Sequence, residues 1–230
     1  MQVIKISIFF CIDMPKITAD ILQNSTINIT GYKMINGKKE IPIVGIHGWK
    51  GNGDSFKAVA KLFNLENTYW FYPQAPYEIG QGEFSWAKEV EEGVYETTKA
   101  QQYLEDFFVN KVFTKFPPEE VHVIGFSQGA TICFEFVLKL PVKLAGVYPI
   151  AGFLRDFNST KARLHHKQKE TPIFIGHGEN DDIVPSKSSK RIYDILKKET
   201  KNVDLHLYNG GHKIGLSYIK EAKKLILGEK

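Results

Sequence analysis

Residues 125–129, with sequence GFSQG, hold a serine whose neighbours suit a nucleophile. The pentapeptide follows a strand-like run at 121–124 and precedes a helix-like run at 130–137. A serine in a sharp turn between strand and helix needs small residues two positions away on both sides, because a side chain there would collide with the turn. The two glycines meet that need. The pattern predicts that the Ser127 hydroxyl is exposed at a helix N-terminus, where backbone N–H groups favour developing negative charge.

A nucleophilic serine needs a base to take its proton and an acid to orient that base. In strand–turn–helix serine sites, the acid follows the serine along the chain and the histidine comes last. His212 lies in the sequence NGGH directly after a strand-like run at 203–208, and the two glycines permit a tight turn. His47 also ends a strand-like run, but the chain order disfavours it as the base. The other histidines lie inside predicted strands, in a polar segment or at the entrance of the acid loop, so His212 is the candidate base.

The candidate acids lie in the loop 177–185, HGENDDIVP, which follows an apolar run at 173–175. The carboxyl ends of parallel strands meet at one edge of a sheet, so this loop should open beside the serine turn. Asp181 and Asp182 are both candidates, and Glu179 is a weaker third. The aspartate that does not orient the base is expected to cap the next helix or to bind loop amides. His177, at the loop entrance, is expected to make local hydrogen bonds.

A glycine-rich loop at 47–53, HGWKGNG, follows another apolar run at 41–46. Backbone N–H groups of such a loop can bind the oxyanion that forms when a nucleophile attacks a carbonyl group. The N–H of Gln128, directly after the serine, would be the second donor. The alternative is that these glycines only make a turn. We favour the oxyanion role because the loop lies where that motif belongs.

Strand-like and helix-like segments alternate along the chain, which predicts an α/β fold with a mostly parallel central sheet and helices on both faces. Strands are predicted at 26–34, 41–47, 68–72, 121–124, 142–151, 172–176 and 203–208. Helices are predicted at 54–65, 89–116, 130–137, 186–200 and 214–227.

The composition suits one globular domain. The chain has 230 residues, of which 43% are hydrophobic and 24% are charged. We expect a single domain over 1–230, in which residues 1–40 form an N-terminal extension and edge strands. The net charge is +4 and the lysines are scattered, so no nucleic-acid partner is expected.

The two cysteines, Cys11 and Cys133, suggest no disulfide framework and favour a cytoplasmic protein. The apolar run at 3–12 is short and lacks a signal-peptide cleavage site, and no segment is long enough to span a bilayer. Stable membrane insertion is therefore not expected. No metal-ligand cluster or phosphate-binding loop stands out, and serine chemistry needs no cofactor, so neither a metal nor a cofactor is expected.

Six stretches of the chain form a recognisable set: IHGW at 46–49, YPQAP at 72–76, FSW at 84–86, GFSQGA at 125–130, HGxxDxxVP at 177–185 and GH at 211–212. The set resembles the phospholipase/carboxylesterase family of α/β-hydrolases, which includes the acyl-protein thioesterases. The resemblance runs from about residue 41 to the C-terminus. It implies the α/β-hydrolase fold without a large cap domain. The family's acid stands four residues after the histidine of its His-Gly pair and three before its Val-Pro pair, and both counts select Asp181.

The same resemblance implies that the oxyanion donors are the N–H groups of Trp49 and Gln128, and that Ser85 and Trp86 line the acyl or alcohol pocket. Large side chains in or beside the strand-end loops are our candidates for apolar pocket walls: Trp49, Trp86, Phe126, Phe153 and Ile183. For the last three, ordinary core packing is an equal alternative. The chain departs from the family at Lys50, where a glycine is common.

The expected function is hydrolysis of carboxylic esters by a serine carboxylesterase, through a covalent acyl-enzyme made by Ser127, His212 and Asp181. Within enzymes, the alternative is an acyl-protein thioesterase or a lysophospholipase. From another class, the alternative is a catalytically silent ligand-binding protein on a hydrolase scaffold, because a fold alone does not imply catalysis. The expected partner is a small-molecule or lipid ester. The sequence specifies neither the acyl length nor the oligomeric state.

Overall fold

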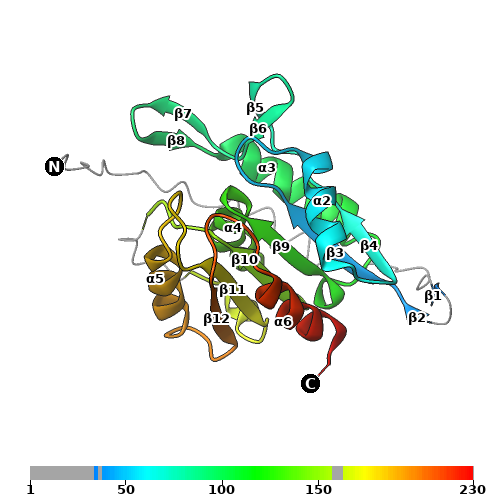
Figure 1. Ribbon diagram of the computed structural model, residues 1–230. Helices are drawn as coiled ribbons and strands as arrows, with labels where there is room; N and C mark the ends of the chain where they lie inside the picture. Colours follow the sequence, from blue (N-terminus) through cyan, green and yellow to red (C-terminus); the bar gives the residue numbers. More distant parts are fainter. Residues whose placement is uncertain (1–33, 36–37, 157–162, 230) are drawn as a thin grey trace.

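The computed structural model describes residues 34–35, 38–156 and 163–229 (Figure 1). Most of the predicted N-terminal extension, nearly all of the strand predicted at 26–34, and Cys11 lie outside these residues. The described chain starts with a short antiparallel pair, β1 (Met34–Ile35) and β2 (Lys38–Lys39).

One six-stranded sheet forms the centre of the molecule, in the order β12-β11-β10-β9-β3-β4. All of its pairings are parallel. Its strands are β3 (Ile41–Ile46), β4 (Thr68–Phe71), β9 (His122–Phe126), β10 (Gly146–Ile150), β11 (Ile173–Gly178) and β12 (Val203–Tyr208). The order reverses at β3, because β4 lies on one side of it and β9 on the other. At such a reversal the connections leave in opposite directions and open a crevice beyond the carboxyl ends of the strands.

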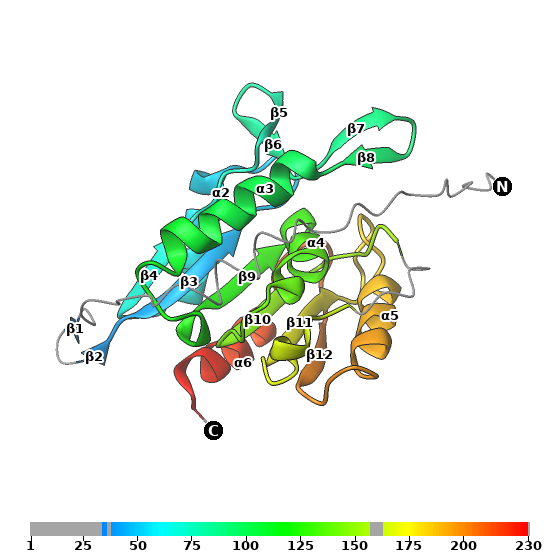
Figure 2. The same cartoon turned by 180° about the vertical axis from the view of Figure 1, so that it is seen from behind.

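Helices cover both faces of the sheet, as predicted (Figures 1 and 2). One face carries α3 (Thr98–Phe107), α4 (Gln128–Glu135) and α5 (Lys187–Leu196); the other carries α2 (Gly53–Phe63) and α6 (Leu216–Leu227). Three short 3-10 helices lie in the connections, at Pro118–Glu120, Val137–Lys139 and His166–Gln168.

The alternation of side chains along the strands produces two separate hydrophobic cores. On β3, Val44 belongs to the core that contains Leu104 of α3. Its neighbour Ile43 belongs to the core that contains Phe56 of α2 and Tyr218 of α6. The sheet is therefore buried on both sides, and chemistry can take place only at its edges or at the ends of its strands.

The helix predicted at 89–116 is wrong in its first part. Two antiparallel hairpins precede the helix: β5 (Tyr77–Gly80) with β6 (Glu83–Ser85), and β7 (Lys88–Glu91) with β8 (Val94–Glu96). Gly93 makes the turn between β7 and β8 with a φ of 75°, a conformation that ends a helix. The helix α3 starts only at Thr98 and continues as a π-helical turn at Phe108–Val112. Both hairpins project from the body of the domain (Figure 1).

The other predicted elements of the sheet and its helices are confirmed, with small changes at their ends. The strand predicted at 142–151 starts at Gly146, and the helix predicted at 186–200 ends at Leu196. The asparagine before α2 explains where that helix begins. Asn52 accepts a hydrogen bond from the N–H of Ser55, whose hydroxyl accepts one from the N–H of Asn52.

Cys133 lies on α4 directly beneath the turn that holds Ser127. It is completely buried, and burial raises the pKa of its thiol. A Cβ atom added at Gly125 would lie 2.7 Å from its sulfur. The packing under the serine turn is therefore tight.

Candidate active site

Ser127 occupies a sharp turn between β9 and α4, as the sequence predicts. Its φ of 56° and ψ of −117° are unusual for a residue with a side chain, and such strain is found at functional sites. A Cβ atom added at Gly129 would lie 2.1 Å from the carbonyl oxygen of Ile46, and one at Gly125 would lie 2.4 Å from the carbonyl oxygen of Gly129. Both glycines are therefore required by close approach of the backbone. The N–H of Ser127 donates to the Ile150 carbonyl (2.8 Å), which ties the turn to β10.

The structure brings Ser127, His212 and Asp181 together from the ends of three strands. His212 Nε2 lies 3.0 Å from Ser127 Oγ, and His212 Nδ1 lies 2.7 Å from Asp181 Oδ2. The imidazole is half-buried, and its ring centroid lies 5.0 Å from that of Phe126. These distances allow a proton to pass from the hydroxyl to the imidazole while the carboxylate holds the ring.

Asp181, and not Asp182, contacts His212. Asp181 is buried, whereas Asp182 is exposed. The other oxygen of Asp181, Oδ1, accepts hydrogen bonds from the N–H groups of Ile183 (3.0 Å) and Val184 (2.8 Å). Burial acts to raise the pKa of Asp181, but the hydrogen bonds from Val184, His212 and Ile183 outweigh it, so the pKa is lowered and the carboxylate is ionised near neutral pH. Asp181 thus makes both sets of contacts, to the histidine and to the loop amides, that the sequence divided between two aspartates.

His177 makes local hydrogen bonds, as predicted, and it makes them next to the acid. Its ring is completely buried. Nε2 lies 2.7 Å from the carbonyl oxygen of Val184 and 3.2 Å from Asp181 Oδ2, and Nδ1 lies 2.6 Å from Ser189 Oγ. Sequence reasoning missed Ser189, since a serine in the first turn of a helix carries no signal of such a contact.

The loop after β3 passes beside Ser127, where an oxyanion would form. A Cβ atom added at Gly48 would lie 3.2 Å from the Cβ of Ser127. Among the described residues, the N–H groups of Trp49 and Gln128 donate to no protein acceptor. Both are therefore available to a developing oxyanion.

His47 orients the peptide group that carries the Trp49 N–H. Its Nε2 accepts a hydrogen bond from the N–H of Ala75 (3.1 Å), so the proton is on Nδ1, which donates to the carbonyl of Gly48 (2.8 Å). Because the Gly48 carbonyl and the Trp49 N–H belong to one planar peptide unit, holding one sets the direction of the other. Burial lowers the pKa of His47, which keeps this ring neutral.

The hairpin β5–β6 holds the same loop from the other side. The N–H of Lys50 donates to the carbonyl of Phe84 (3.0 Å), and the N–H of Phe84 donates to the carbonyl of Gly51 (3.2 Å). Lys50 has a φ of 63°, so it adopts the left-handed conformation that the family's usual glycine would adopt easily.

The side chain of Gln128 is a further support that sequence reasoning missed, since the sequence singled out only its backbone. Its Oε1 accepts a hydrogen bond from the N–H of Trp86 (2.9 Å), and its Nε2 donates to Ser85 Oγ (2.9 Å). The hydroxyl of Ser85 donates in turn to the carbonyl of Ala87 (2.6 Å). These hydrogen bonds connect the start of α4 to Ser85, at the end of β6, and to Trp86, which follows it.

The predicted pocket walls occupy different environments. Trp49 is 59% exposed and Ile183 is 68% exposed, while Phe126 and Phe153 are half-buried. Trp86 is completely buried in the core, where its indole N–H donates to the carbonyl of His47 (2.9 Å). This placement corrects the prediction that Trp86 lines a substrate pocket, because the side chain has no exposed surface and instead contacts the loop after β3 from beneath.

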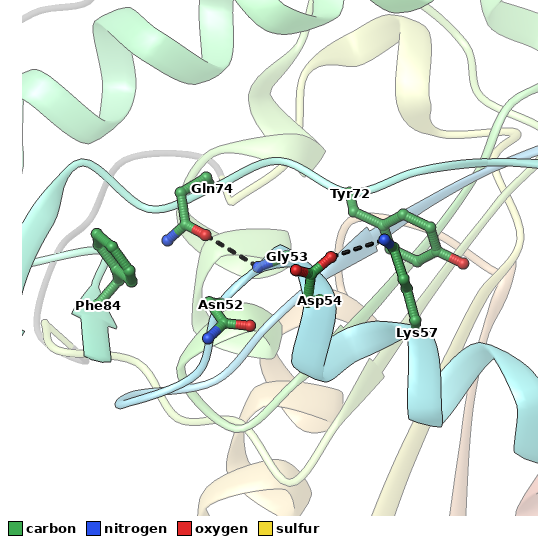
Figure 3. Close-up of a pocket in the computed structure, with 7 residues that line it drawn as sticks. All are labelled: Asn52, Gly53, Asp54, Lys57, Tyr72, Gln74 and Phe84. Carbon is green, nitrogen blue, oxygen red and sulfur yellow. Dashed lines mark hydrogen bonds and ion pairs between the residues drawn. The ribbon is translucent and has the colours of Figure 1, made fainter. Parts of the chain in front are cut away.

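A cavity of about 500 Å³ opens at the start of α2 (Figure 3). It is lined by Asn52, Gly53, Asp54, Lys57, Tyr72, Gln74 and Phe84. Two contacts join its lining residues: the N–H of Gly53 donates to Gln74 Oε1 (3.0 Å), and Lys57 pairs with Asp54 (2.6 Å). No member of the Ser127–His212–Asp181 set lines it, so this cavity is separate from the candidate catalytic centre.

Within the described ranges, no group of three histidine, cysteine, aspartate or glutamate side chains could hold a metal ion. The helices described here are all too short or too polar to cross a membrane.

Curated proteins of similar sequence are hydrolases. The chain is 28% identical over 195 residues to acyl-protein thioesterase 1 of Debaryomyces hansenii, which covers 73% of this chain and 82% of the relative. It is 24% identical over 198 residues to carboxylesterase SOBER1 of Arabidopsis thaliana, which covers 77% of this chain and 86% of the relative.

Solved structures show the same fold. The crystal structure of Arabidopsis thaliana SOBER1 superposes with a TM-score of 0.71 at 23% identity, covering 82% of this chain and 98% of that one. The structure of Zea mays acyl-protein thioesterase 2 superposes with a TM-score of 0.65 at 24% identity, covering 86% and 97%. The model of the phospholipase/carboxylesterase family matches residues 35–227. The match spans the whole sheet and all three strand ends that meet at Ser127, and on that basis the chain belongs to the phospholipase/carboxylesterase family of α/β-hydrolases.

Proposed function

We propose that this protein is a serine carboxylesterase that hydrolyses carboxylic esters through a covalent acyl-enzyme. One observation carries the proposal: an unbroken chain of hydrogen bonds runs from Ser127 Oγ through His212 to Asp181 Oδ2, with distances of 3.0 and 2.7 Å. The hydrolase family to which the chain belongs supports it. A catalytically silent scaffold would have no need to keep a strained serine in line with a base and an acid.

In the proposed reaction, Ser127 Oγ attacks the ester carbonyl as His212 Nε2 takes its proton. The carboxylate of Asp181 holds the proton of His212 on Nδ1 and stabilises the imidazolium. The N–H groups of Trp49 and Gln128 donate to the oxyanion of the tetrahedral intermediate. His212 then protonates the alcohol oxygen as the ester C–O bond breaks. The alcohol leaves, and the acyl group remains bound to Ser127. Water, deprotonated by His212, then attacks the acyl carbonyl. The bond to Ser127 Oγ breaks as His212 returns the proton to that oxygen, and the carboxylic acid is released.

The substrate we propose is a small-molecule or lipid ester with an apolar acyl group. The exposed side chains of Trp49 and Ile183 follow the ends of β3 and β11, which puts large apolar surface at the edge of the sheet where the serine lies. We propose that the protein works in the cytoplasm, in keeping with its two cysteines. The second candidate function is that of an acyl-protein thioesterase, favoured by the name of the Debaryomyces hansenii relative.

A fluorophosphonate probe tests the nucleophile. It should label the native protein at Ser127, and both heat-denatured protein and the Ser127→Ala variant should stay unlabelled. Ser127→Ala should also lower kcat on a p-nitrophenyl ester by roughly 10³-fold or more. Absence of labelling in the folded protein would favour the silent scaffold.

Two substrate series separate the esterase from the thioesterase. The first is a set of p-nitrophenyl esters of increasing acyl length, and the second is a set of S-acylated peptides with the same acyl groups. The carboxylesterase proposal expects the higher kcat/KM on the oxygen esters. A consistent preference for the S-acyl series would replace it with the thioesterase function, since the same three residues can carry out both reactions.

A further inference from the structure

The carboxylate that orients the base faces two histidines, of which the proposed mechanism uses only one. Asp181 Oδ2 lies 2.7 Å from His212 Nδ1 and 3.2 Å from His177 Nε2. The two rings differ in environment, because His212 is half-buried while His177 is completely buried on β11. The second histidine therefore has no direct access to a substrate, but it shares an oxygen with the base.

The contacts of His177 determine which of its nitrogens carries the proton. Nε2 lies 2.7 Å from the carbonyl oxygen of Val184, which can only accept a hydrogen bond, so Nε2 is protonated. Burial is the main influence on the ring and lowers the pKa of His177, which keeps it neutral. Nδ1 is then an acceptor, and the hydroxyl of Ser189 at 2.6 Å must donate to it. The Ser189 hydroxyl therefore donates to His177 Nδ1. The Nε2–H of His177 donates to the Val184 carbonyl and lies beside Asp181, with 3.2 Å between Nε2 and Oδ2.

We propose that His177 is a positioning residue of this site, whose Nε2–H, oriented by Ser189, shares Asp181 Oδ2 with His212 and limits how strongly the carboxylate binds the His212 imidazolium. The inference rests on the proposed serine mechanism. It assigns to the buried pair His177 and Ser189 an effect on the proton affinity of the catalytic base.

The position of Asp181 does not itself depend on His177. Its Oδ1 accepts two backbone N–H groups, from Ile183 and Val184, and these hold the carboxylate in the turn. What His177 adds is a further N–H group close to the oxygen that binds His212, with 3.2 Å between His177 Nε2 and Asp181 Oδ2. When one carboxylate oxygen faces two N–H groups, each weakens the contact that the oxygen makes with the other. Removing the His177 N–H should therefore strengthen the contact between Asp181 and a protonated His212.

Among the residues that the structure describes, few other charged or titratable groups face this carboxylate. From β12, Tyr208 interacts with it electrostatically; burial is the main reason that the pKa of Tyr208 is raised to about 12, so this phenol stays neutral. From the loop after β12 comes His212, and from β11 comes His177. The neighbouring acids Asp182 and Glu179 are exposed to solvent. The acid limb of the pH profile should therefore respond to His177 without interference from a second buried charge.

Two substitutions of His177 distinguish the contribution of its Nε2 from that of its Nδ1. The amide nitrogen of a glutamine reaches roughly the place of Nε2, whereas the amide of an asparagine reaches only the place of Nδ1. In His177→Asn, we expect the acid limb of kcat/KM on a p-nitrophenyl ester to move to higher pH by roughly half a unit. KM should change less than about twofold, and kcat at alkaline pH should fall less than about tenfold, far from the loss caused by breaking the triad. His177→Gln should keep the wild-type limb.

Either of two results would overturn the proposal. One is an acid limb that stays at the wild-type pH in His177→Asn, and the other is an equal shift in both variants, because the Nε2 donor would then not be its cause. Thermal unfolding of the two variants reports on their folding, and Ser189→Ala is the milder change if His177→Asn is unstable. It should move the limb in the same direction by a smaller amount, and an unmoved or downward limb there also contradicts the proposal.

A measurement on the unmodified chain needs no variant at all. In protein with ¹⁵N-labelled histidine, NMR should show His177 neutral and protonated on Nε2 across neutral pH. A proton on Nδ1, or an imidazolium, would refute the proposal. This result is independent of the catalytic one: a native protein that resists the fluorophosphonate defeats the proposed function, while a wrong tautomer of His177 defeats only the role of this residue.

Discussion

The two halves of the candidate site are built by different means. At the ends of β3 and β9, the backbone sets the geometry: a strained serine, two glycines in close contact with carbonyl oxygens, and two free amide groups. At the ends of β11 and β12, side chains set it, through the hydrogen bond between His212 and Asp181 and the close contact of His177 with the same carboxylate. The first half should therefore be damaged by added atoms, and the second by the loss of a donor or acceptor.

The largest expected difference between the two halves comes from replacing one glycine by alanine in each half. A Cβ at Gly129 would lie 2.1 Å from the carbonyl oxygen of Ile46, whereas one at Gly211 would meet only the carbonyl oxygen of Asn180, at 3.6 Å. We expect Gly129→Ala to destabilise the protein by more than about 3 kcal/mol in urea unfolding and to abolish esterase activity. Gly211→Ala should fold normally and keep most of the activity. Equal tolerance of the two substitutions would remove the distinction between the halves.

The next effect in size concerns the acid. Asp181→Asn retains the shape of the side chain but removes the charge that holds the His212 tautomer, so kcat should fall by roughly 10² to 10⁴-fold. Asp182→Asn is the matched control, because this residue is exposed, and it should stay within about twofold of the wild type. The measurement is kcat on a p-nitrophenyl ester at pH 8, and the reverse ranking would show that the loop is arranged differently in solution.

A smaller effect is expected for Gln128, whose side chain supports the half of the site at the ends of β3 and β9. Gln128→Ala keeps the N–H that faces the oxyanion but leaves the N–H of Trp86 without its acceptor, at a cost of about 1–3 kcal/mol. We expect kcat to fall about tenfold, with thermal unfolding at lower temperature. Gln81→Ala, on an exposed hairpin, should change neither quantity. If Gln128→Ala behaves like the control, the contact between α4 and the chain after β6 has no catalytic importance.

The last prediction concerns stability and leaves the chemistry untouched. Burial lowers the pKa of His122 on β9 to about 4, whereas an unfolded histidine titrates near 6.5. The unfolded state therefore binds a proton that the folded state refuses, and this contribution to stability is complete above about pH 6.5 and is lost as the pH falls toward 4. The loss for this residue is on the order of 3 kcal/mol. The melting temperature should fall between pH 7 and 5, and His122→Phe should flatten that slope.

The sequence predicted the placement of those candidate site residues that directly follow strand ends. Ser127, Asp181 and His212 each lie within four residues of the end of a parallel strand, and the topology alone brings such residues to one edge. The choice between Asp181 and Asp182 needed the resemblance to the family. Local reasoning had no means to decide which of two adjacent carboxylates faces the histidine.

What the sequence did not predict depends on contacts between distant segments. The hairpin β7–β8 was mistaken for a helix because its apolar residues Val90 and Tyr95, 54% and 38% exposed, are spaced among charged residues as on an amphipathic helix. Trp86 was placed at a pocket because its burial beneath the oxyanion loop depends on a partner 39 residues away. Ser189 gave no signal for the same reason.

The buried thiol of Cys133, beneath the serine turn, offers a way to measure how often this part of the fold opens. Cys133 is sealed from solvent and its raised pKa disfavours the reactive thiolate, so an alkylating reagent can reach it only when α4 separates from the sheet. Once Cys11 is replaced by serine, the rate of alkylation in native buffer reports how often the nucleophile's support comes apart. Comparing that rate with and without an acyl group on Ser127 would show whether the proposed covalent intermediate rigidifies the centre of the molecule or loosens it.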